Sequence, residues 1–240
     1  AKRDQAALDL KNTTVLAPSA GVVAQADRLL VGQQVSPALA VLSLALVDAR
    51  GSDPLRPGTA AERHGRGWIL DGEKRSVSAA DTAQRILLPA RTGTETRVFL
   101  LGPAAPGVTR SRQRLSTGEP VFTLTLAGVH LDESEMLAGG TRGANTVLPH
   151  LYESTLVAHC AMQLGVSERA LDMTARYVRE RVQFGVPIGS FQAVQHRAAD
   201  CYIDLEAMRW TTWRAALQVE QGHPSARECA VAKFWAAEGG

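Results

Sequence analysis

The sequence has few cysteines, and those it has are scattered. Its 240 residues contain three, Cys160, Cys201 and Cys229, which form no Cys-x-x-Cys motif. An odd number of widely spaced cysteines indicates reduced thiols rather than disulfides. Cys160 and Cys201 lie in helical apolar patterns, so we expect both in the core, where a free thiol packs as a small hydrophobe. The six histidines form no His-Glu-x-x-His pair, and we expect no metal site.

The sequence also lacks a charge surplus and a long apolar run. Lys and Arg number 26 and Asp and Glu 24, a formal net charge of +2, which argues against a nucleic-acid-binding protein. The longest nearly unbroken apolar run, residues 38–47, is ten residues long, about half of a membrane span. No secretory leader opens the chain. We therefore expect a soluble, intracellular protein, placed in the cytoplasm.

What the sequence does contain changes character near residue 147. Before it, short apolar runs lie between glycines and prolines, which predicts the strands of a small antiparallel β-barrel or sandwich. These runs are residues 68–70, 86–88, 98–101 and 121–131. We interpret Asp71-Gly72 as a hairpin turn and Pro89 as the end of a strand.

After residue 147 the apolar period becomes helical. Val157, Cys160, Leu164, Leu171 and Val178 share one stripe of a first helix, which we expect to stop at Gly185. A second helix runs from Phe191 towards Gln221, with Ser190 as its cap, and Ser225 to Glu228 reads as a capping box that begins a third.

The predicted fold class is therefore α+β, with an antiparallel β-barrel or sandwich followed by an antiparallel helical bundle. Residues 1–36 form an unclear remnant of an N-terminal region, residues 37–145 the strand domain, and residues 146–240 an incomplete bundle. No internal repeat interrupts this order.

A specific signature lies between the first two predicted helices. Residues 181–195 read Arg-Val-Gln-Phe-Gly-Val-Pro-Ile-Gly-Ser-Phe-Gln-Ala-Val-Gln, which resembles the R-x-Q-F-G-x-P-I-x-x-F-Q-x-x-Q signature of acyl-CoA dehydrogenases. Upstream, Gly51-Ser52-Asp53 and residues 67–74 are similar to the G-S-D and G-(aromatic)-x-L-x-G-x-K stretches of that family. The landmarks occur in family order, and the helical part looks most like actinobacterial members that act on sterol side chains.

The resemblance implies an FAD enzyme that oxidises the Cα–Cβ bond of an acyl-CoA thioester. In this family a carboxylate removes the α proton while a hydride leaves Cβ for flavin N5. The resemblance also implies a homo- or hetero-oligomer with its FAD site across the subunit interface, and an electron-transfer flavoprotein as electron acceptor.

The same resemblance assigns roles to individual residues. Arg181 matches the arginine that contacts the FAD pyrophosphate from a neighbouring subunit, as suits a planar guanidinium. Further positions match the adenine end, the flavin ring and the acyl-CoA. The remaining cofactor positions are Ser52, Ser76, Ser78, Gln183, Phe184, Phe191 and Gln192, and the substrate positions are Ser52, Glu153 and Thr155.

Three departures from the family pattern leave alternatives open. Ser76 replaces an aromatic residue that covers the flavin, and the segment before Gly51 lacks the family threonine. Thr155 stands where some members place the catalytic glutamate. Glu153 lies about 200° around the helix from it, so we assign no catalytic residue and expect the base beyond Gly240 or from a partner chain. A non-catalytic or flavin-poor partner subunit and a non-redox enzyme of the same fold remain alternatives.

Overall fold

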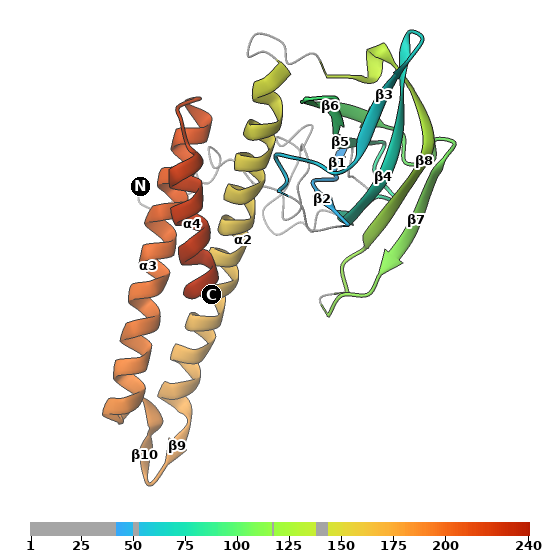
Figure 1. The fold of residues 1–240 in the computed structure, drawn as a ribbon. Coiled ribbons are helices and arrows are strands. Elements are labelled where there is room, and N and C mark those ends of the chain that lie inside the picture. The colour runs from blue at the N-terminus through green and yellow to red at the C-terminus, as the bar shows by residue number, and fades with distance from the viewer. Residues whose placement is uncertain (1–41, 50–52, 117, 138–143) are drawn as a thin grey trace, which may run out of the picture.

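A strand domain and a helical arm make up residues 42–49, 53–116, 118–137 and 144–240, which this computed structural model describes (Figure 1). The predicted remnant at residues 1–36 lies outside them, and the predicted division at residues 145 and 146 stays a prediction. The strands are β1 (Leu42–Leu44), β2 (Val47–Asp48), β3 (Ala60–His64), β4 (Gly67–Ser78), β5 (Arg85–Thr92), β6 (Glu95–Leu101), β7 (Val108–Gln113), β8 (Val121–Asp132), β9 (Val182–Gln183) and β10 (Val186–Pro187). The helices are η3 (Glu133–Glu135), α2 (Ala144–Glu180), η5 (Ile188–Ser190), α3 (Gln192–Glu220) and α4 (Ala226–Glu238).

The strand domain is one curled eight-stranded sheet. Its order is β1-β5-β3-β4-β8-β7, with β2 joined to β4 and β6 joined to β5. Most neighbours are antiparallel, whereas β1 and β3 pair with β5 in parallel. The concave face buries a continuous apolar core that includes Leu70, Ile86, Phe99 and Leu124. This sheet, followed by packed helices, confirms the predicted fold class.

Two positions that we expected to end strands lie inside them. Asp71-Gly72 lies inside β4, at a register shift between Leu70 and Gly72, and makes no hairpin turn. Gly72 is needed there because a Cβ on it would lie 2.9 Å from the Cα of Thr59. Pro89 lies within β5 and pairs with Val98, so it does not end the strand.

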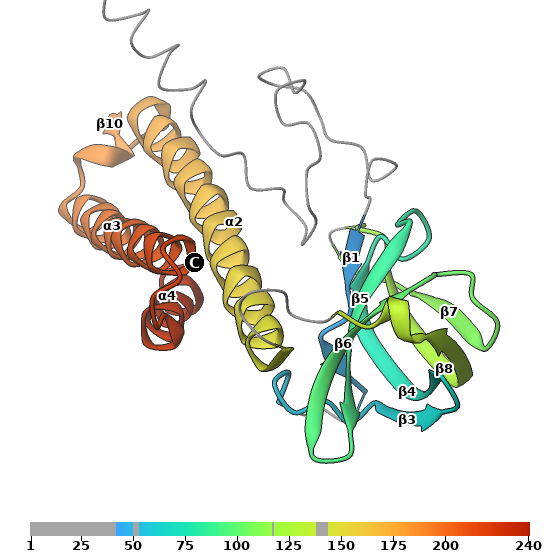
Figure 2. The ribbon, with the colours of Figure 1, turned by 90° about the horizontal axis from the view of Figure 1, so that it is seen from above.

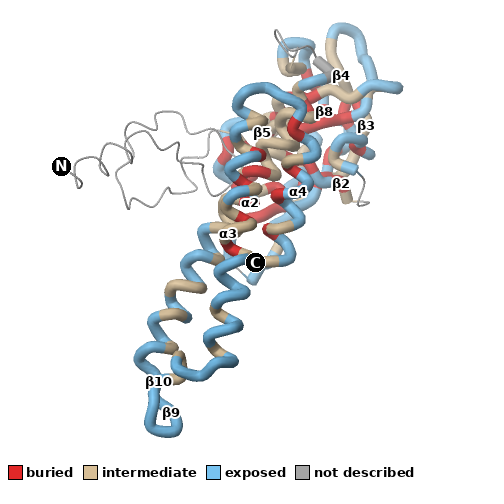
Figure 3. Tube along the Cα trace, turned by 90° about the vertical axis from the view of Figure 1, so that its left-hand side faces the viewer, coloured by how far each residue is buried: buried red, intermediate tan, exposed pale blue. Residues whose placement is uncertain are grey.

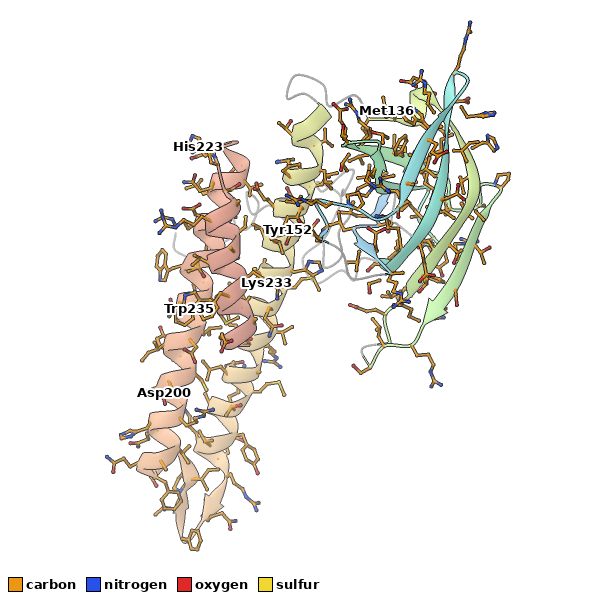
Figure 4. All side chains as sticks on the ribbon, viewed as in Figure 1. Met136, Tyr152, Asp200, His223, Lys233 and Trp235 are labelled. Carbon is orange, nitrogen blue, oxygen red and sulfur yellow. The ribbon has the colours of Figure 1, made fainter. Side chains whose placement is uncertain are left out.

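Helix α2 joins the two parts of the molecule. It lies between the sheet on one side and α3 and α4 on the other (Figure 2). Its first turns bury Leu148 against Leu46 and Val98 of the sheet, and Tyr152 packs on the same cluster. Figure 4 places Tyr152 on the upper part of α2, far from Asp200 on the lower part of α3.

The helices share a second core near the upper half of α2. Val157 and Cys160 of the predicted stripe are buried there with Met208 of α3 and Cys229 of α4, and Leu164 packs against them. Further down, α2 and α3 form an arm with largely exposed side chains (Figure 3). Cys201 lies on that arm and is exposed, so the prediction that it packs in the core is wrong.

The helix ends differ from the predicted ones because their polar side chains find other partners. Helix α2 ends at Glu180, five residues before Gly185. Phe191, rather than Ser190, occupies the cap position of α3, and the Ser190 hydroxyl donates to the Pro187 carbonyl at 2.7 Å. Ser225 precedes α4 as predicted, but its hydroxyl makes no bond within α4, so the capping box is wrong.

Candidate functional site

The proposed flavin-facing serines lie beside a bulge in β4. Lys74 pairs with Leu124 and Val77 with Phe122, so Arg75 and Ser76 together face a single residue of β8. Ser76 takes a φ of 54°, in the left-handed region that few non-glycine residues adopt. The bulge brings Val77 onto the same buried face as Lys74, and it leaves Ser76 exposed and Ser78 half-buried.

A buried polar network lies directly behind this bulge. The Lys74 side chain is fully buried, and its Nζ donates to Oδ2 of Asp48 at 3.0 Å. The backbone N–H and the hydroxyl of Thr59 donate to Oδ1 of Asp48 at 3.0 and 2.5 Å. The sequence did not reveal this network because its three members lie far apart along the chain and carry no motif in common.

The electrostatics of the network follow from burial and pairing. Burial acts to raise the pKa of the Asp48 carboxyl, but the hydrogen bonds from Thr59 and the charge of Lys74 outweigh it, so the pKa is lowered. Burial lowers the pKa of the Lys74 ammonium, and the charge of Asp48 only partly opposes that effect. The Asp48 carboxyl is therefore ionised at neutral pH.

The predicted substrate residues lie on α2 near the sheet. Oε2 of Glu153 accepts the hydroxyl of Ser225 at 2.6 Å, which ties α2 to the start of α4. The Thr155 hydroxyl donates to the Leu151 carbonyl at 2.7 Å, one turn earlier in the same helix. Both side chains are half-buried, and Ser52, the remaining substrate position, lies outside the described residues.

The other predicted cofactor residues gather at the far end of the arm. β9 and β10 form a hairpin with a two-residue turn, Phe184-Gly185, whose φ values are 52° and 82°. Two positive φ angles are typical of a type I′ turn. The Phe184 ring is 93% exposed and meets the ring of Phe191 edge to face at 6.2 Å. Sequence reasoning missed this hairpin and placed the end of the helix in it.

Arg181 and the two glutamines surround the hairpin. Arg181 begins it, and its carbonyl accepts the backbone N–H of Ile188 at 2.8 Å. Its exposed guanidinium pairs with no other residue in the described part of the chain. Gln183 and Gln192 are exposed as well, so the tip of the arm presents a cation, two amides and two aromatic rings to its surroundings.

The predicted cofactor residues therefore form two separate groups. Arg181 follows Thr155 by 26 residues, which corresponds to about 39 Å along a helix axis. Ser76 and Ser78 belong to the sheet beside the upper half of α2, whereas the hairpin lies at the opposite end of the arm (Figure 1). The two groups therefore lie at different ends of the molecule.

A cavity of about 810 Å³ lies elsewhere, between β3 and the β5–β6 hairpin. Trp68 lines it, with the Arg63 guanidinium 5.1 Å from its ring centroid, and both side chains bond to Glu133. None of the predicted site residues in the described ranges lines it. Those ranges hold no cluster of three or more metal-ligating side chains and no helix able to cross a membrane.

Comparisons with known proteins point to one family. Residues 143–239 match the family model described as acyl-CoA dehydrogenase, C-terminal domain. Acyl-CoA dehydrogenase FadE27 of Mycobacterium tuberculosis is 38% identical over 208 residues, which are 83% of this chain and 53% of that protein. The chain thus spans about half the length of this curated relative.

Solved structures agree. The crystal structure of the ChsE4-ChsE5 complex from Mycobacterium tuberculosis superposes with a TM-score of 0.74 at 36% identity, over 82% of this chain and 52% of that chain. A structure described as the Tcur3481-Tcur3483 steroid ACAD G363A variant gives a TM-score of 0.75 at 37% identity, over the same shares. Both descriptions name two components.

Proposed function

The chain belongs to the acyl-CoA dehydrogenase family, and from this premise we propose that it takes part in FAD-dependent α,β-dehydrogenation of an acyl-CoA thioester. The observation that carries the proposal is the separation of its two groups of cofactor residues. The strand domain of one chain offers Ser76 and Ser78, and the arm tip of a second chain offers Arg181 and its neighbours. One FAD then lies between two chains.

The residues at the tip fit such a cofactor. The unpaired guanidinium of Arg181 can hold pyrophosphate oxygens in a bidentate manner. The exposed rings of Phe184 and Phe191 and the amides of Gln183 and Gln192 offer stacking and hydrogen bonds to the adenine end. The β9–β10 hairpin holds these groups together at the tip of the arm.

The outer face of α3 supports an assembly of more than one chain. Leu205, Met208 and Ala215 bury one face of this helix. Ile203, Trp210, Trp213 and Leu217 stand exposed on the other. A helix that is apolar on two faces is usually buried on both, and large exposed apolar patches mark interaction surfaces. We assign this face to contact with a further chain.

In the strand domain, the proposed roles are orientation and shielding. When bound, FAD supplies the hydride acceptor for the Cβ–H bond. Ser78 would offer its hydroxyl to the bound flavin, and Ser76 would stand beside it. Ser52, Glu153 and Thr155 lie along the acyl-CoA, with the Cα proton taken by a carboxylate from elsewhere in the assembly. An electron-transfer flavoprotein receives the electrons.

A titration with FAD tests the proposal. We expect the purified native assembly to bind FAD with a perturbed flavin absorbance spectrum, and Arg181→Gln to bind it about tenfold or more weakly. Arg179→Gln is the matched control, since Arg179 is an exposed arginine two residues away in the last turn of α2. Absence of flavin binding by the wild type, or equal losses in both variants, would refute the proposal.

A second candidate function is that of a partner subunit without its own catalytic base. Thr155 occupies the position at which some family members carry the catalytic glutamate, and its hydroxyl donates to the Leu151 carbonyl. A hydroxyl so placed is no acceptor for a Cα proton. Turnover of acyl-CoA by the chain alone would exclude this candidate, and turnover only after addition of a second, different subunit would support it.

A further inference from the structure

The Asp48–Lys74–Thr59 network occupies a particular place in the chain. Asp48 ends β2, and the chain reaches Ser52 four residues later. Lys74 precedes Ser76 by two residues and stands immediately before the β4 bulge. Asp48 and Lys74 are direct cross-strand partners. One ion pair therefore joins the end of β2 to the part of β4 that carries the proposed flavin-facing serines.

Thr59 fixes the carboxylate from a third direction. It precedes β3 and donates both its backbone N–H and its hydroxyl to the same oxygen of Asp48. It also lies against the backbone of Gly72, where any side chain would meet its Cα and Oγ1 at 2.9 Å. The carboxylate is thus held by β3 and β4 together.

Such a network is a poor way to gain stability. Burying two charges costs several kcal/mol per ion, and well-packed apolar residues often replace a buried pair without loss. What the network does provide is a unique register, because Lys74 must point inward to reach Asp48. Regular alternation of β4 beyond Lys74 would exchange the faces of Val77 and Ser78, since a one-residue slip reverses every side chain.

We propose that Lys74, Asp48 and Thr59 are positioning residues of the flavin site, which hold the β4 bulge against the end of β2 so that Ser76 and Ser78 face the cofactor together. This inference rests on the proposed function. The three residues touch neither cofactor nor substrate; they act through the backbone segments that carry the serines.

The test compares flavin affinity with stability in the native assembly. We expect Lys74→Met to weaken FAD binding at least tenfold and to alter the flavin absorbance spectrum. Leu131→Ala is the control, because Leu131 is buried in the same core but pairs with Trp68 near the start of β4, at the other end of that strand from the bulge. The control should lose thermal stability to a similar extent and keep its FAD affinity within about twofold.

A second pair of variants keeps the test decisive if Lys74→Met fails to fold. Thr59→Val removes only the hydroxyl donated to Asp48, whereas Thr59→Ser keeps it. We expect weaker FAD binding in Thr59→Val and wild-type binding in Thr59→Ser. Equal affinities in both would overturn the inference, as would loss of affinity in proportion to stability across all variants. Failure of the wild type to bind FAD would instead refute the proposed function.

Discussion

Ser225 donates its hydroxyl to Oε2 of Glu153 across 2.6 Å, so the residue that precedes α4 is fixed to the N-terminal third of α2. Ser225 is almost completely buried, although it stands at the N-terminus of a helix. The Glu153 carboxylate also lies near the N-terminus of α4, where a negative charge interacts favourably with the helix dipole. This hydrogen bond joins α2 to α4, the helices that carry the buried Cys160 and Cys229.

Removal of this hydroxyl should loosen the bundle. We expect Ser225→Ala to lower the free energy of unfolding by about 1–2 kcal/mol, because Glu153 loses a charge-assisted hydrogen bond in a half-buried place. Urea denaturation followed by circular dichroism measures this. Ser111→Ala, at an exposed position of the edge strand β7, is the control. A change below about 0.3 kcal/mol in Ser225→Ala would show that the pair contributes nothing.

The turn at Phe184 should respond to backbone preference separately from ring contacts. Phe184→Asn and Phe184→Ala both remove the ring that meets Phe191, but asparagine tolerates a φ of 52° better than alanine. We expect the asparagine variant to be more stable by up to about 1 kcal/mol. Both variants should bind FAD more weakly. Thermal unfolding that ranks alanine above asparagine would contradict the turn assignment.

Acid stability should depend on Asp48. Its pKa lies below the usual value in the folded state, so its contribution is complete above the unfolded pKa of 3.8 and is lost as the pH falls through the folded pKa. Thr59→Val removes a hydrogen bond that lowers this pKa. Unfolding followed from pH 6 to about pH 2 should therefore begin at higher pH in Thr59→Val than in the wild type or in Thr82→Val, an exposed control. Identical acid limbs would contradict the assigned cause.

The three thiols should differ in reactivity. Burial raises the pKa of the Cys160 thiol, and burial with the nearby charge of Glu153 raises that of Cys229 to about 11. Cys201 is exposed on α3. Iodoacetamide at neutral pH should therefore label native protein at Cys201 alone, since the thiolate is the nucleophile. Peptide mass spectrometry reads the sites, and rapid native labelling of Cys229 would contradict the packing described.

Local patterns in the sequence predicted the elements well and their ends poorly. The helical period located α2, the apolar runs located the central strands, and cap and stop signals located α3 and α4 although neither Ser190 nor Ser225 caps its helix. Asp71-Gly72 has the composition of a hairpin turn but lies inside β4. There the Asp71 carboxylate accepts the Gly128 N–H at 2.8 Å, and the missing side chain of Gly72 makes room for Thr59. The hairpin in the arm turns at Phe184-Gly185, a pair with weak turn propensity.

The buried network lay beyond prediction for a different reason. A lysine in a strand is normally expected to face outward, whereas Lys74 lies four residues after the buried Leu70 and therefore on the same, core-facing side of β4. Its partner Asp48 lies 26 residues earlier, so the pairing depends on the sheet register that no local window contains. The motif resemblance indicated which residues matter for the cofactor, but the division of those residues into two distant groups came from the length of α2.

If FAD lies between two chains, its binding depends on their association, and sedimentation velocity with detection of flavin absorbance measures this dependence. We predict that the flavin signal sediments only with species of two or more chains and is released as dilution dissociates them. Flavin that remained tightly bound to a single chain would contradict a site shared between two chains.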